Sequence, residues 1–163
     1  MNRLPFLALA LLLCAARASG AQSAPSKRLT ASLQRIFGGG VRIDSVLADT
    51  TVVIRLRKAD ALLGYAIVGD AMGKDQPITY LVAVDTALQL LDVDILVYRE
   101  EHGGEVTYES WRKQFRGKHP GDGLQVGREI RGISGATISV NAVTAGIRER
   151  LVELAAFRKS GVL

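Results

Sequence analysis

Apolar residues in the region after position 25 first recur at the spacing of an α-helix. Between residues 26 and 37 they stand three or four positions apart, at Leu29, Leu33, Ile36 and Phe37. Ser26 stands where an N-cap residue is expected, because its hydroxyl can accept a hydrogen bond from a free amide of the first turn. Three glycines at 38–40 end the pattern. We therefore predict a helix over residues 26–37, with one face packed on the rest of the domain.

Four apolar stretches rich in Val, Ile, Leu and Tyr follow, and this composition is typical of β-strands. They cover residues 51–57, 62–69, 78–85 and 89–98. A turn-rich hexapeptide, residues 70–75, joins the second to the third, and only residues 86–88 separate the third from the fourth. Connections this short favour antiparallel neighbours. The four stretches therefore predict an antiparallel meander.

Two more helices are predicted towards the C-terminus. The aromatic residues Tyr108, Trp111 and Phe115 stand three and four positions apart, which indicates a short helix ending near Gly117, with the aromatic rings as core anchors. From Ile138 onward a longer amphipathic pattern has its apolar positions at Val140, Val143, Ile147, Leu151 and Leu154. The element order predicts a single α+β domain, in which a meander sheet packs with an N-terminal helix and C-terminal helices.

The first residues have the pattern of a secretory signal peptide. Arg3 supplies a positive charge, and the apolar run over residues 4–16 is too short to cross a bilayer. Small residues then lead to Ala21, so we predict a signal peptide of residues 1–21 that is cleaved after Ala21. The exported domain, residues 22–163, is expected in the periplasm or another extracytoplasmic space. An uncleaved membrane anchor is the alternative.

Composition removes several classes of function. Cys14 is the only cysteine of the chain, and Leu13 before it is larger than the small residue that a lipidation signal requires, so no lipid anchor is expected. After cleavage, the domain has no cysteine for a disulfide, a thiolate metal ligand or a nucleophile. His102 and His119 belong to no spaced ligand pattern, so no metal site is predicted. The 21 basic and 16 acidic residues are too balanced to indicate a nucleic-acid partner.

The segment with the most chemical information precedes the long helix. Residues 132–139 are mostly small or hydroxyl-bearing and stand at a predicted helix N-terminus, where free amides and the helix dipole favour an anion such as phosphate. Spacing alone also allows Ser134 or Thr137 to act only as a helix cap. A serine hydrolase using Ser134 is disfavoured, because a nucleophile elbow requires a parallel sheet and a glycine where this chain has Ala136.

The hexapeptide Ser134-Gly135-Ala136-Thr137-Ile138-Ser139 resembles the flavinylation motif of the FMN-binding domain family. Members of that family include subunits of the sodium-translocating NADH:quinone oxidoreductase and of its ferredoxin-linked relative. Further similarity lies upstream, in Tyr98-Arg99-Glu100, Gly104-Glu105-Val106, Trp111, Gln114-Phe115 and Gly117-Lys118. In all, the resemblance covers about residues 64–147. It implies that Thr137 receives FMN through a phosphoester bond, with Ser134, Gly135 and Ala136 beside the cofactor.

The same resemblance implies the partners and the role. In the family, a separate Mg-dependent flavin transferase moves FMN from FAD onto the threonine in the extracytoplasmic space. A threonine hydroxyl without a neighbouring base depends on such an enzyme for activation. The attached flavin performs redox chemistry while the protein holds and tunes it. We therefore expect an electron carrier with no catalytic residue and no substrate reaction of its own, which works with a membrane or extracytoplasmic redox partner.

One position departs from the family pattern. Members usually carry an acidic residue, typically Asp, six positions before the threonine, and this chain has Arg131 there. Arg131 is expected either to pair with the flavin phosphate or to be a solvated surface residue. Glu100 and Glu105 are likewise expected either to contact the flavin or to be solvated residues of the loop. The alternative function is a non-catalytic binding or sensor module that holds FMN non-covalently or has lost it.

Overall fold

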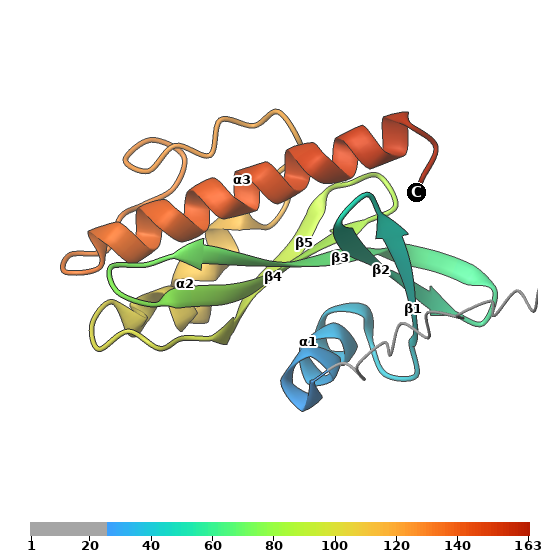
Figure 1. Ribbon diagram of the computed structural model, residues 1–163, viewed down its shortest axis with the longest axis horizontal. Coiled ribbons are helices and arrows are strands. Elements are labelled where there is room, and N and C mark those ends of the chain that lie inside the picture. The colour runs from blue at the N-terminus through green and yellow to red at the C-terminus, as the bar shows by residue number, and fades with distance from the viewer. Residues whose placement is uncertain (1–25) are drawn as a thin grey trace, which may run out of the picture.

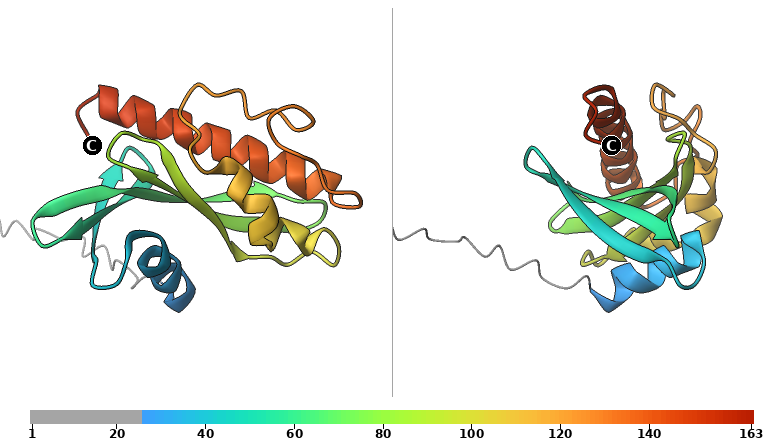
Figure 2. Two further views of the ribbon diagram at one scale, coloured as in Figure 1. Left: turned by 180° about the vertical axis from the view of Figure 1, so that it is seen from behind. Right: turned by 90° about the vertical axis from the view of Figure 1, so that its right-hand side faces the viewer.

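The computed structural model describes residues 26–163, so the predicted signal peptide and its cleavage site lie outside the described residues. The chain folds into three layers (Figures 1 and 2), with a twisted sheet between helix α3 on one face and helix α1 on the other. The sheet has five strands in chain order, each antiparallel to its neighbours: β1 (Arg42–Ala48), β2 (Thr51–Lys58), β3 (Ala61–Met72), β4 (Pro77–Asp85) and β5 (Leu90–Val97). The predicted α+β class and antiparallel meander are confirmed.

Helix α1 (Lys27–Phe37) begins and ends as the sequence predicts. Ser26 is its N-cap, and the Ser26 hydroxyl accepts a hydrogen bond from the amide of Leu29 at 3.2 Å. Leu33, at the centre of the predicted apolar stripe, is completely buried against one face of the sheet. The buried apolar side chains on that face are Ile54, Leu56, Ala66, Leu81, Ala83 and Leu96.

Strand β1 is not predicted by the sequence. Only Ala48 of its seven residues is buried, and its apolar residues do not alternate with polar ones as they do in a typical half-buried strand. The strand lies at the edge of the sheet and pairs with β2 over its whole length, from Arg42↔Arg57 to Ala48↔Thr51. Main-chain pairing rather than an apolar face therefore holds β1 in place.

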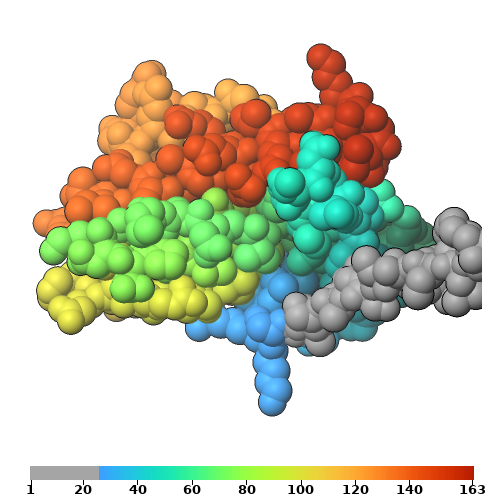
Figure 3. Space-filling model, in the orientation of Figure 1, coloured from blue at the N-terminus to red at the C-terminus, as the bar shows by residue number. Residues whose placement is uncertain are grey.

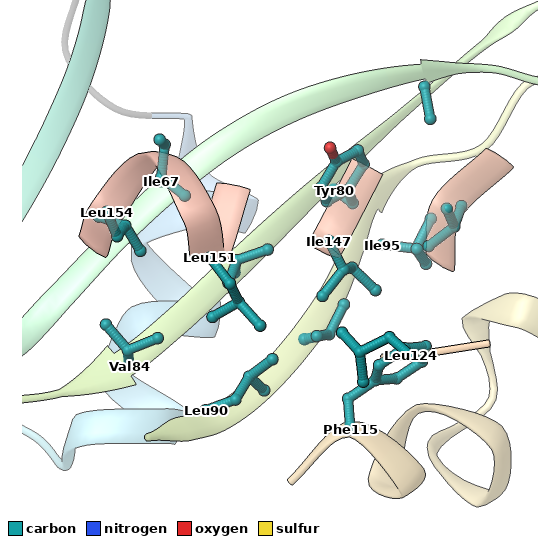
Figure 4. Packing of buried hydrophobic residues seen from close by; sticks show 14 of the residues in the cluster. Ile67, Tyr80, Val84, Leu90, Ile95, Phe115, Leu124, Ile147, Leu151 and Leu154 are labelled. Atoms are coloured by element: carbon teal, nitrogen blue, oxygen red, sulfur yellow. The ribbon is translucent and has the colours of Figure 1, made fainter. Parts of the chain in front are cut away.

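Helix α3 (Thr137–Lys159) is 23 residues long and starts one residue before the predicted pattern. All of its predicted apolar positions are buried, and Figure 4 shows Ile147, Leu151 and Leu154 packed with side chains of the sheet. Gly146 allows the helix to approach β4 closely, because a Cβ atom there would lie 2.3 Å from the hydroxyl oxygen of Tyr80. The amphipathic pattern thus predicts correctly both the helix and the face that it buries.

The predicted short helix between positions 108 and 117 forms over residues 109–115, as α2 (Glu109–Arg112) followed directly by the 3-10 turn η2 (Lys113–Phe115). A separate 3-10 turn, η1 (Gly104–Thr107), precedes it. Trp111 and Phe115 are buried and their rings meet edge to face, with centroids 5.1 Å apart. Tyr108 is 60% exposed, because it precedes α2 with an extended main chain and so leaves the helical stripe. Two of the three expected core anchors are confirmed.

Two carboxylates of β5 join α1 to the α2–η2 segment. Asp92 is buried and forms ion pairs with Arg35 of α1 at 2.7 Å and with Arg116, just after η2, at 3.3 Å. Asp94 pairs with Arg35 at 3.2 Å and with Arg112 of α2 at 3.2 Å. Since the two carboxylates share guanidinium partners from both segments, they fix α1 and α2 relative to the same strand.

The ion pairs of Asp92 with Arg35 and Arg116 should make the stability of the domain depend on pH. Burial by itself would raise the pKa of Asp92, but hydrogen bonds from Arg35 and Arg116 outweigh it and hold this pKa below the ordinary value of 3.8. A carboxyl whose pKa is lower in the folded state stabilises the fold above its unfolded pKa. That contribution is lost as the pH falls through the folded pKa. We expect Asp92→Asn to lower the free energy of unfolding at about pH 7 and to weaken its fall below about pH 4.

Urea unfolding at several pH values measures both effects. Asp44→Asn is the matched control and should change stability little. Within residues 26–163 the ion pairs of Asp44, with Arg42 at 3.1 Å and Arg57 at 3.8 Å, are accessible to solvent. An acid dependence identical in wild type and Asp92→Asn would contradict the role given to the ion pairs of Asp92.

Candidate functional site

The predicted motif lies where α3 begins, at one end of the sheet (Figure 1). Thr137 is the first residue of the helix and is exposed. A groove of about 530 Å³ lies beside it. The other walls of the groove are formed by residues 74–76, in the turn between β3 and β4, and by residues 99–102, which follow β5. The structure thus brings together three segments that are far apart in the sequence.

The first turn of α3 has N–H groups that donate no hydrogen bond within residues 26–163. The N–H groups of residues 137–139 have no acceptor within residues 26–163, and the first hydrogen bond of the helix runs from the amide of Val140 to the carbonyl oxygen of Ala136 at 2.9 Å. Ala136 is the N-cap, and no side chain caps the helix. The alternative that Ser134 or Thr137 serves only as a cap is therefore wrong. Such a helix end suits an anion.

The four predicted site residues have different environments. Ser134, Gly135 and Thr137 are exposed, whereas Ala136 is buried in the core beneath α3. Gly135 is in the left-handed region with φ of +80°, and a Cβ atom there would meet no other atom within 4 Å. Three of the four residues line the groove, and Ser134 does not. The main chain at the motif therefore faces open space, which leaves room for a bulky group at Thr137.

The groove wall that follows β5 is held by Tyr98. The Tyr98 hydroxyl donates a hydrogen bond to the carbonyl oxygen of His102 and lies 3.0 Å from the Oγ of Ser139 in α3. Gly103 is packed against this pair, with φ of +84°, and a Cβ atom there would lie 2.9 Å from the Tyr98 hydroxyl oxygen. The sequence alone assigns no role to Gly103 or Ser139. The only feature of the sequence that points to Ser139 is its position in the hexapeptide of residues 134–139.

Glu100 braces the turn between β3 and β4. Its Oε1 accepts hydrogen bonds from the amides of Gln76 at 3.0 Å and Asp75 at 2.8 Å, and these bonds hold the pKa of Glu100 below its ordinary value of 4.5. A Cβ atom on Gly73 would lie 2.2 Å from the same oxygen. The Glu100 carboxylate therefore shapes the groove wall, and Glu100 itself lines the groove. Glu105 is exposed.

Hydrogen bonds to the main chain of Arg131 fix the position of this residue. Its carbonyl oxygen accepts a hydrogen bond from the Trp111 indole at 2.9 Å, and its amide donates to the side-chain oxygen of Gln114 at 2.8 Å. The Arg131 side chain is exposed, does not line the groove and forms no ion pair with another part of residues 26–163. Of the two alternatives for Arg131, the geometry favours the solvated one. Trp111 and Gln114 thereby position the segment that leads into the motif.

Comparison with known proteins agrees with this geometry. Residues 73–152 match the sequence model of a family described as the FMN-binding domain. The chain carries an FMN-binding domain. A relative that is 28% identical over 109 residues is one of the subunits of the proton-translocating ferredoxin:NAD(+) oxidoreductase complex of Clostridium ljungdahlii. The match covers 62% of this chain and 58% of the relative, so the chain spans less than two thirds of that protein's length. The family inferred from the motif is confirmed.

The FMN-binding domain contains the whole groove. Its matched segment begins at Gly73, in the turn that Glu100 braces, and ends within α3. The groove volume of about 530 Å³ lies within the range of ligand pockets, and the exposed hydroxyl and free amides at Thr137 suit a phosphate ester. The residues present therefore fit FMN.

The described region has neither a metal-binding cluster nor a membrane-spanning helix. Residues 26–163 contain no group of three or more His, Cys, Asp or Glu side chains arranged to hold a metal ion. No helix within the same region is both long enough and apolar enough to span a membrane.

A pair of glycine substitutions tests the packing of the groove wall. Gly103→Ala places a methyl group against Tyr98 and Ser139 in a left-handed conformation, so we expect a loss of about 2–4 kcal/mol of stability. Gly135→Ala has the same left-handed conformation but open space around it, so the loss should be about 1 kcal/mol. Thermal and urea unfolding measure both values. Equal losses would show that the close packing of Gly103 contributes nothing.

Proposed function

We propose that this domain is an electron carrier with FMN joined to Thr137 by a phosphoester bond. The observation that carries the proposal is the position of Thr137, whose exposed side chain stands at the start of α3 and at the edge of the groove. It lies beside three amides that have no acceptor within residues 26–163. An attached phosphate would accept hydrogen bonds from these amides and lie at the positive end of the helix dipole. When bound, FMN supplies the redox chemistry.

We propose that a separate Mg-dependent flavin transferase loads the domain from FAD. In this reaction the Thr137 Oγ attacks the phosphorus of the FMN half of FAD. A new P–O ester bond forms, the pyrophosphate bond breaks, and AMP leaves. The hydroxyl proton must pass to a base, and the Thr137 hydroxyl has no hydrogen-bond partner within residues 26–163, so the transferase supplies that base.

The proposed redox partner belongs to a membrane or extracytoplasmic system. Support comes from the similarity to a component of a ferredoxin:NAD(+) oxidoreductase complex. The groove presents side chains of both charges, including Lys74, Arg99, Asp75 and Glu101, around the place where an attached flavin would extend. These groups would orient the flavin and tune its potential.

Substitution of Thr137 tests the covalent linkage. Thr137→Val removes the oxygen and preserves the shape at an exposed position, so stability should change little while covalent loading is lost. Thr137→Ser is the matched control and should retain loading, because it keeps the hydroxyl. Each protein is produced with its transferase and examined by intact mass and by flavin fluorescence in a denaturing gel. Wild type should gain the mass of FMN less one water.

Covalent flavin on Thr137→Val would assign the attachment to another residue. Ser134→Ala provides a second comparison, because Ser134 is exposed and outside the groove, and should reduce loading only partly. Arg131, which replaces the usual acidic residue, favours the second candidate, a binding or sensor module that holds FMN non-covalently. In that case, wild type would be yellow before denaturation and would carry no added mass afterwards.

We propose that the domain is exported after cleavage of a signal peptide. The support is the pattern of residues 1–21, with a charged start, a short apolar run and small residues before the cleavage point. N-terminal sequencing of the protein from the extracytoplasmic fraction should begin at Gln22. A protein that begins at Met1 and stays with the membrane would instead show an uncleaved anchor.

A further inference from the structure

Strand β3 extends beyond its partner β2. Pairing between them ends at Val53↔Ile67, whereas β3 continues to Met72 and remains paired with β4 on its other side. Within residues 26–163, segment 68–72 therefore forms a strand edge without a neighbour. Their main-chain groups make no hydrogen bond to any described part of the chain other than β4. An open edge of this kind can pair with another extended chain.

The open edge exists because the β1–β2 hairpin turns towards α3. Thr51, at the tip of the hairpin, donates a hydrogen bond from its hydroxyl to Glu153 of α3. Ala48 and Val53 are buried in the apolar cluster beneath that helix. Figure 3 shows the hairpin tip (cyan) against the C-terminal half of α3 (red). The hairpin is thus held away from residues 68–72, and the space beside them stays open.

A second groove, of about 850 Å³, occupies this space. Residues 68–70 line it from β3 and residues 50–52 from the hairpin, while Leu29 of α1 and Arg150 of α3 contribute side chains. With the exception of Arg150, these residues precede the segment that matches the FMN-binding family. The groove is therefore distinct from the flavin groove beside Thr137.

Asp70 gives the second groove a negative charge. Its carboxylate accepts a hydrogen bond from the Thr79 hydroxyl at 2.6 Å and has no cationic partner within residues 26–163. The other charges that line the groove are neutralised, because Asp44 pairs with arginines of β1 and β2, and Arg150 pairs with Glu153 at 2.7 Å. A chain that lies beside β3 would therefore be favoured by a lysine or arginine facing Asp70.

We propose that residues 68–72 bind an extended basic segment of a partner protein, which adds to the sheet as a strand beside β3. Main-chain hydrogen bonds to the open edge supply affinity, and Asp70 selects a lysine or arginine. A second copy of the chain fits less well. Antiparallel pairing of two such edges would place one Asp70 opposite the other, because Asp70 is the central residue of the edge.

The test uses a synthetic seven-residue peptide of alternating valine and threonine with lysine at the central position, and a matched peptide with glutamate in place of lysine. Backbone amide signals of the uniformly labelled protein report binding. We expect saturable shifts at residues 68–72 and slower exchange of those amides in this segment that face away from β4. The lysine peptide should bind about two- to fivefold more tightly than the glutamate peptide. A lysine peptide that is N-methylated on the edge facing β3 should lose binding.

Asp70→Asn keeps an acceptor for Thr79 and should remove the preference for lysine. Asp75→Asn is the matched control, because Asp75 is an exposed acid at the flavin groove, and it should preserve the preference. Equal binding of the two peptides by wild type, or shifts confined to the flavin groove, would overturn the proposal. A dimer in sedimentation equilibrium, together with slow exchange of the amides of residues 68–72 that face away from β4 in the absence of peptide, would also overturn it.

Discussion

The position of α3 on the sheet depends on a close contact between Tyr80 and two glycines. A Cβ atom on Gly69 would lie 2.6 Å from the Tyr80 hydroxyl oxygen, and one on Gly146 would lie 2.3 Å from it. The tyrosine therefore fills the space that these residues leave between β3 and α3, and burial raises the pKa of Tyr80 to about 12. Thr137 lies nine residues before Gly146, about 14 Å along the helix axis, so this contact sets where the helix end meets the groove.

The sequence predicts the elements whose signal is local. The helix at Ser26 has both a cap and a periodic stripe, and α3 has a regular stripe of buried positions. Four strands show through their composition. Strand β1 does not, because it is held mainly by pairing with β2, and no local apolar pattern reports such pairing.

The chemistry of the groove was only partly predictable for a similar reason. The hexapeptide identified Thr137 and the helix start, since small residues before a helix are visible in the sequence. The brace formed by Glu100 spans 24 residues to Gln76, and the contact of Tyr98 with Ser139 spans 41. Contacts between segments so far apart depend on the register of the strands and on how α3 packs on the sheet. The local pattern of apolar and polar residues predicts neither.

The two sides of the flavin groove are attached to the domain with unequal strength. Helix α3 is fixed by a stripe of buried apolar side chains, whereas most residues of the β3–β4 turn and of segment 99–102 are exposed and are joined to the domain by hydrogen bonds of Glu100, Arg99 and Tyr98. Segments held by a few solvent-accessible contacts open locally at a lower free energy than the core unfolds. The groove can therefore widen by local opening of these two segments while the helix that carries Thr137 stays in place.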